Sequence, residues 1–298
     1  MKNFIIITMI LAILIPIPSK AFNQEESRLI VLAFDVVFNG LKSGIGASYN
    51  GNDFWPAFAK GALSGIVVHA GKELASWNGP IPFAGATGGY LHDLGVSMSD
   101  NVMKGLPMLS HYRTEIGFME IDFSKSEINA YILPGHLYSI IKNISDGGNI
   151  DIKHSLQYMS PIFYTNNTIG ARAKPKGYRF NAVALSGTVI YDEEIISLDS
   201  TLSHEFQHIL FQRSLRFCDY IIEESIGKNS NIIENIPIIN PISKWFNHIH
   251  YGTLVGDTLL LLPSLIDPAL YYWTPTEIHS YTMQRQGHLP NWHPLYNH

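Results

Sequence analysis

The chain has 298 residues, of which 46% are hydrophobic, 12% are aromatic and only 15% are charged. Ordinary soluble domains contain about 25% charged residues, so this composition excludes intrinsic disorder, a coiled coil and a highly charged scaffold. The 20 Lys and Arg are spread along the sequence and the net charge is −5, which argues against a nucleic-acid-binding surface. The single cysteine, Cys218, can form no disulfide within the chain and is interpreted as a core residue.

The N-terminus has the layout of a secretory signal peptide. Lys2 supplies a positive charge, residues 4–18 form an uncharged apolar stretch, and small residues precede a cleavage point after Ala21. The stretch is short for a membrane span and contains two prolines, although an uncleaved anchor is the alternative. We therefore expect residues 1–21 to be a signal peptide and the mature protein to be secreted or located in the periplasm or cell envelope.

Residues 24–75 are predicted to form two close-packed helices. Apolar residues recur at helical spacing between Leu29 and Leu41, and glycines punctuate the region. Turn-forming residues at 48–53 separate the two helices. Charged residues such as Asp35 argue against a full membrane span, so an amphipathic helical hairpin is expected, and a peripheral association with a membrane is compatible with it.

The next segments are predicted to be a loop and a β-hairpin. Residues 77–110 are rich in Gly and Pro, but they lack the lysine and the strand–loop–helix context of a phosphate-binding loop. Alternating apolar and polar residues at 119–123 and 128–132 predict two strands that turn at 124–126.

Strand-like patterns continue at 150–165 and 180–191. A turn at 146–149 is the expected boundary between two parts of the mature chain. The first part, 22–145, is a helical and β region of unknown role, and the second, 146–298, carries the chemistry described next. Together these elements predict an α+β fold.

His204, Glu205 and His208 form an H-E-x-x-H motif within a helix predicted over 197–217. Residues four apart share one face of a helix, so the two imidazoles can bind one cation while Glu205 contacts a water held by it. No Gly or Pro occurs from 197 to 226, which predicts an uninterrupted helix. Its apolar stripe leaves the three motif residues away from the centre of the buried face.

The motif resembles the active-site helix of the zincin metallopeptidases, and residues 182–191 stand where zincins have the edge strand that aligns the substrate. The resemblance implies a minimal zincin core with a peptide or protein substrate. It also implies a catalytic Zn²⁺ held by His204 and His208, with Glu205 as the general base that takes a proton from the attacking water.

A third protein ligand is needed to complete such a site, and two places compete for it. Ser214 replaces the third His of the metzincin signature, so the resemblance to gluzincins implies a glutamate. Glu277 lies in a segment similar to the P-x-E-x-x-A pattern of late third ligands, with Ser280 in place of Ala. Glu223 and Glu224 are nearer to the motif, but no signal marks the chain reversal that they would need. We expect Glu277 to be the third ligand.

The favoured function is thus zinc-dependent peptide hydrolysis. The alternative is a non-hydrolytic envelope or membrane-associated protein that keeps the motif as a degenerate or structural metal site. A serine hydrolase is disfavoured, because the sequence around Ser186 lacks the first glycine of a nucleophile elbow.

Overall fold

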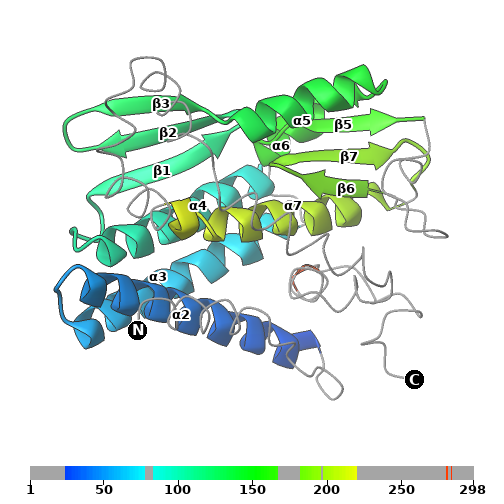
Figure 1. Ribbon diagram of the computed structural model, residues 1–298. Helices are drawn as coiled ribbons and strands as arrows, with labels where there is room; N and C mark the ends of the chain where they lie inside the picture. Colours follow the sequence, from blue (N-terminus) through cyan, green and yellow to red (C-terminus); the bar gives the residue numbers. More distant parts are fainter. Residues whose placement is uncertain are drawn as a thin grey trace, which may run out of the picture.

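The protein has a mixed α+β structure, as predicted, and we describe it from a computed structural model (Figure 1). The structure describes residues 24–77, 83–166, 182–195 and 197–219, together with Ser280 and Met283. The predicted signal peptide lies outside these residues. Within them, the helices and two small sheets form layers, with the sheets at the top of Figure 1. The helices α4 (Ala84–Met103) and α7 (Leu198–Ser214) lie beneath the sheets, and α2 (Gln24–Tyr49) and α3 (Phe54–Ala75) lie at the base.

Helices α2 (Gln24–Tyr49) and α3 (Phe54–Ala75) form the predicted hairpin, joined by a short turn. Small residues let the two backbones approach closely, because a Cβ at Gly65 would overlap the carbonyl oxygen of Asp35. By length and composition alone, the segment Arg28–Tyr49 could also cross a membrane. This property is compatible with an envelope location.

The loop predicted at 77–110 is wrong for most of its length, because residues Ala84–Met103 form the helix α4. The frequent glycines favoured a loop, since glycine has low helix propensity. Here they serve packing instead: a Cβ at Gly88 would overlap the backbone nitrogen of Ala75 in α3. Close contact between α3 and α4 therefore outweighs local propensity.

The first sheet is an antiparallel meander of β1 (His111–Ile116), β2 (Met119–Ser124) and β3 (Ile128–Ile132). The predicted hairpin is β2–β3, and its turn at 124–126 is confirmed. Sequence patterns missed β1 because its two fully buried residues, Thr114 and Glu115, are polar.

The second part of the β structure is preceded by α5 (Pro134–Ser145) and contains one further short helix, α6 (Ile152–Tyr158). Its four-stranded sheet has the order β4-β5-β7-β6, with β5 and β7 parallel and the other pairs antiparallel. The strands are β4 (Asn149–Ile150), β5 (Ile162–Thr165), β6 (Ala182–Leu185) and β7 (Thr188–Asp192).

Two strand predictions need correction here. The pattern at 150–165 contains α6 as well as strands, and 182–191 is a hairpin instead of a single strand. Ser186 and Gly187 have φ angles of 44° and 70°, so they form a tight turn that reverses the chain. The edge position next to the motif helix therefore belongs to β6.

The motif helix is α7 (Leu198–Ser214), which confirms the helix predicted over 197–217 to within a few residues. It ends at Ser214, and a short helical turn follows at 217–219. Every residue from 202 to 214 is buried, so the polar residues of this part of the helix lie inside the protein together with its apolar stripe. The reason is that the sheet covers one side of α7 and the N-terminal helices cover another with polar partners.

Candidate metal centre

His204 and His208 lie one turn apart near the middle of α7. Their side chains are buried, with exposed fractions of 7% and 2%, and their ring planes are nearly perpendicular. The two Nε2 atoms are 3.2 Å apart. Two nitrogens bound to one tetrahedral Zn²⁺ at 2.0–2.1 Å would be about 3.4 Å apart. The histidine pair therefore has the separation that two ligands of a single metal ion require.

Neighbouring residues of the motif fix the rotation of α7 about its axis. Gln207 donates from Nε2 to the carbonyl oxygen of Lys72 at 3.1 Å and to Ser76 Oγ at 2.8 Å, both at the end of α3. Phe206 packs against Tyr158, with ring centroids 5.0 Å apart. Glu205 is also largely buried, so all five motif residues are held inside the protein.

Ser280 brings a distant part of the chain to this pair. Its hydroxyl oxygen lies 3.2 Å from His208 Nδ1, across 72 positions of sequence, and the residue is fully buried. Ser280 belongs to the segment predicted to supply the third ligand. Glu277, Glu223 and Glu224 themselves lie outside the described residues. Within the described ranges, no group of three or more His, Cys, Asp or Glu side chains is arranged to hold a metal ion.

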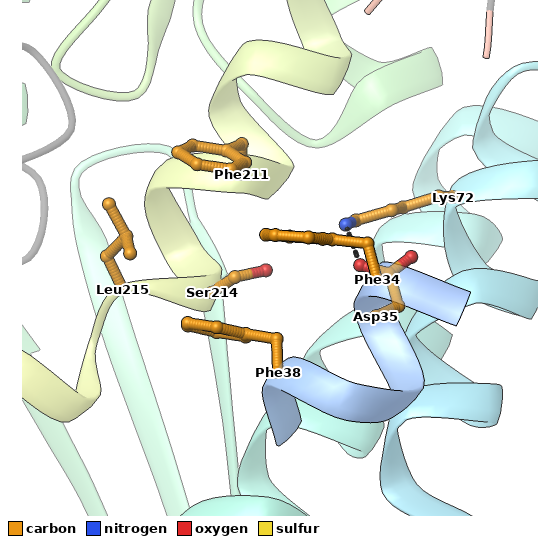
Figure 2. Close-up of a pocket in the computed structure, with 7 residues that line it drawn as sticks. All are labelled: Phe34, Asp35, Phe38, Lys72, Phe211, Ser214 and Leu215. Atoms are coloured by element: carbon orange, nitrogen blue, oxygen red, sulfur yellow. Dashed lines mark hydrogen bonds and ion pairs between the residues drawn. The ribbon is translucent and has the colours of Figure 1, made fainter. Parts of the chain in front are cut away.

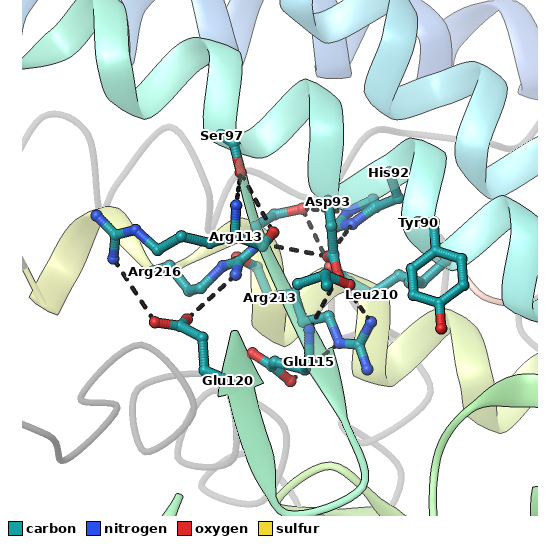
Figure 3. A network of polar contacts seen from close by, with 12 residues as sticks. Tyr90, His92, Asp93, Ser97, Arg113, Glu115, Glu120, Leu210, Arg213 and Arg216 are labelled. Carbon is teal, nitrogen blue, oxygen red and sulfur yellow. Dashed lines mark hydrogen bonds and ion pairs between the residues drawn. The ribbon is translucent and has the colours of Figure 1, made fainter. Parts of the chain in front are cut away.

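A network of buried charges anchors the C-terminal end of α7 (Figure 3). Arg213 pairs with Asp93 at 3.1 Å and with Glu115 at 3.0 Å, and Arg216 pairs with Asp93 and Glu120, both at 3.3 Å. Burial opposes ionisation of Asp93, but the two guanidinium groups outweigh it and hold the pKa of this carboxyl below its usual range. Helix α4 and the first sheet are thereby tied to the end of the motif helix.

His92 extends the same network. Its Nε2 lies 2.9 Å from Ser214 Oγ and its Nδ1 lies 3.3 Å from Asp93 Oδ1. Burial lowers the pKa of His92 to about 4, so the imidazole is neutral near pH 7. Sequence analysis missed these residues, because partners about 120 positions apart share no local pattern.

The start of α7 has a second polar cluster. His154 Nδ1 lies 2.5 Å from Asp151 Oδ2, which also accepts a hydrogen bond from the Tyr191 hydroxyl at 2.7 Å. The other ring nitrogen of His154 is 3.9 Å from Asp199 in the first turn of α7. Burial raises the pKa of Tyr191 above its usual value, so the hydroxyl stays protonated and donates. The cluster links α6 and β7 to the motif helix.

A small pocket lies between the N-terminal hairpin and the second half of α7 (Figure 2). Three phenylalanines give it an apolar lining, and the Lys72–Asp35 ion pair, 2.6 Å long, is at one side. Its lining residues are Phe34, Asp35, Phe38, Lys72, Phe211, Ser214 and Leu215. None of the three candidate site residues on α7 is among them, so this pocket is separate from the histidine pair.

Comparison of the chain with protein-family models, with curated proteins and with solved structures found no match.

Proposed function

We propose that this protein is a zinc-dependent peptidase of zincin type that works outside the cytoplasm. The observation that carries the proposal is the 3.2 Å separation of the Nε2 atoms of His204 and His208 on one buried helix. Buried histidines face each other this closely when a cation compensates their lone pairs, or when one imidazole donates to the other. Glu205, which follows His204 in the chain, is also buried.

The contact with Ser280 supports Nε2 of His208 as a ligand atom. Metal-binding histidines commonly donate their second ring N–H to a nearby acceptor, which fixes the tautomer. In the tautomer that binds a metal through Nε2, the Nδ1–H of His208 would donate to Ser280 Oγ, which lies 3.2 Å away, and the lone pair on Nε2 would face His204. The Ser280 hydroxyl would thus accept the hydrogen bond that a carbonyl or carboxylate accepts from metal-binding histidines in other sites.

The same contact favours Glu277 as the third ligand. Glu277 precedes Ser280 by three residues, so their Cα atoms can be no more than about 11 Å apart. Glu223 and Glu224 come after the end of α7 at Ser214, so they do not continue a single straight helix that would carry them away from the motif. The preference for Glu277 therefore rests on its proximity in sequence to a residue that touches His208.

A zinc ion held by this donor set would lower the pKa of a coordinated water to about 7 and polarise the scissile carbonyl. Glu205 accepts the proton from the attacking water and delivers it to the leaving amine. An extended peptide can add to the edge of β6, the outermost described strand of its sheet and one that packs on α7. Backbone hydrogen bonds to β6 would align the scissile bond with Glu205.

Hydrolysis of a mixed peptide library by the zinc-loaded protein tests this function. Glu205→Gln should retain zinc and lower turnover by about 10²–10⁴-fold, because the general base is lost while the ligands remain. Glu194→Gln, the same change at an exposed site just before α7, should leave turnover unchanged. His204→Ala should lose both zinc and activity. A wild-type protein that binds zinc but cleaves nothing would favour the structural metal site over hydrolysis.

A further inference from the structure

The N-terminal hairpin buries charged side chains and exposes large apolar ones. On α2, Asp35 and Lys42 have exposed fractions of 2% and 1%, whereas Leu29 is 64% exposed. Ala33 and Val37 continue the exposed side at four-residue spacing. This order is the reverse of that in a helix whose outer face meets water.

The buried charges of α2 are paired with the neighbouring helices. Asp35 contacts Lys72 of α3 at 2.6 Å, and Lys42 contacts Asp100 of α4 at 2.9 Å. Ser43 Oγ also donates to the carbonyl oxygen of Ser99, at 3.1 Å. The polar side chains thus stabilise the helix layer from within and contribute nothing to the outer surface of α2.

Helix α3 continues the apolar outer surface. Its exposed apolar side chains recur along one side of the helix, at Trp55, Ala59, Leu63, Ile66 and Ala70. Trp55, at the first turn, is 73% exposed. Among the residues of α3, all of which the structure describes, Lys60 is the one charged side chain that is largely exposed.

We propose that this outer face of α2 and α3 lies in the surface of a lipid bilayer, with both helices parallel to the membrane plane. Among the elements that the structure describes, the hairpin forms the outermost layer, on the side away from the sheets (Figure 1). Its outer face can therefore meet a flat surface without moving the sheets. A tryptophan and a lysine beside an apolar stripe are typical of helices at the lipid–water interface, where Lys60 can reach anionic headgroups.

The position of the hairpin in the sequence favours a membrane over a protein partner as the surface that covers its outer face. The uncharged apolar stretch 4–18 precedes α2 by only a few residues. On the proposed export route, α2 would emerge at the bilayer surface whether this stretch is cleaved or retained as an anchor. The hairpin would then fold next to lipid. This proposal rests on the proposed location outside the cytoplasm and is independent of the metal centre.

Flotation of the mature chain with vesicles of phosphatidylethanolamine and phosphatidylglycerol tests the proposal. The wild type should float with the vesicles. The triple variant Val37→Glu, Leu63→Glu, Ile66→Glu should lower vesicle binding at least about tenfold, because three charges would enter the apolar interface. These side chains are exposed, so circular dichroism and thermal unfolding should show a folded protein.

The matched control places the same number of charges on another exposed apolar face. Tyr138, Ile141 and Ile144 lie along the exposed side of α5, away from the hairpin. Their joint change to Glu should leave vesicle binding intact. The proposal is overturned if the wild type stays in solution, if both triple variants bind equally well, or if the wild type is a dimer that the hairpin variant converts to monomers without any vesicle binding.

Discussion

Replacing Asp93 with asparagine should lower the free energy of unfolding more than the removal of a charge at the protein surface. The carboxylate lies between Arg213 and Arg216 and accepts a hydrogen bond from Thr114 Oγ1 at 2.8 Å. The asparagine side chain would have nearly the same volume but no charge. Among the described residues, Arg213 would keep its ion pair with Glu115 and Arg216 its ion pair with Glu120.

The size of the effect follows from burial. Asp93 is fully buried, and both arginine side chains are nearly so. Removing one partner from a buried ion pair costs about 3–5 kcal/mol when the other charge is left unpaired. Here each arginine keeps one glutamate, so we expect the lower end of that range, about 3 kcal/mol. Total stability of a domain is about 5–15 kcal/mol, so Asp93→Asn should remove about a fifth or more of it.

Urea denaturation followed by circular dichroism measures this change, and Asp122→Asn is the matched control. Asp122 is partly exposed and pairs with Arg113 at 3.6 Å, so its loss should cost about 1 kcal/mol or less. Because the folded-state pKa of Asp93 is lowered, its contribution is present above about pH 4 and is lost as pH falls. The difference between wild type and Asp93→Asn should therefore shrink in acid. Equal destabilisation by the two variants at neutral pH would refute the account of the network.

Three further predictions concern packing and protonation. Gly88→Ala should destabilise the protein by about 1–3 kcal/mol in urea titrations, because the added Cβ would overlap the α3 backbone. A Cβ at Gly135 on α5 makes only ordinary contacts, so Gly135→Ala should not destabilise the protein. Equal effects of the two changes would contradict the close helix packing. His92 has a lowered pKa, so the free energy of unfolding should fall by about 3 kcal/mol as pH drops from about 6.5 to about 4. If the free energy of unfolding of His92→Gln depends on pH as steeply as that of the wild type, this assignment is refuted. Burial raises the pKa of Cys218 to about 12. A thiol reagent at about pH 8 should therefore react slowly with the native protein and quickly after unfolding. A fast reaction with the native protein would contradict the burial of this thiol.

The elements that the sequence predicted correctly have strong local patterns. The hairpin of α2 and α3, the β2–β3 hairpin and α7 all combine regular apolar spacing with turn signals or caps. The mispredicted elements are those in which tertiary contacts outweigh local preference. Glycines in α4 serve contact with α3, and buried polar residues conceal β1 from a search for alternating apolar side chains.

The candidate site shows the same division. The spacing of His204 and His208 predicts their convergence, because four residues make one helical turn. The approach of Ser280 to His208 depends on chain folding across 72 residues, and no periodic pattern encodes it. The extent to which a helix is buried is equally non-local. The apolar stripe of α7 predicted one buried face, whereas every residue from 202 to 214 is buried, and α2 turns its charges inward.

The most direct test of the proposed metal centre is a zinc-edge anomalous difference map from crystals of the zinc-loaded protein. The account predicts one strong peak bonded to the Nε2 atoms of His204 and His208, with a carboxylate oxygen of Glu277 as the third protein ligand. A peak completed by Glu223 or Glu224 would correct the ligand set and keep the centre on α7. Zinc bound elsewhere, with the two imidazoles bonded only to each other, would contradict the central claim.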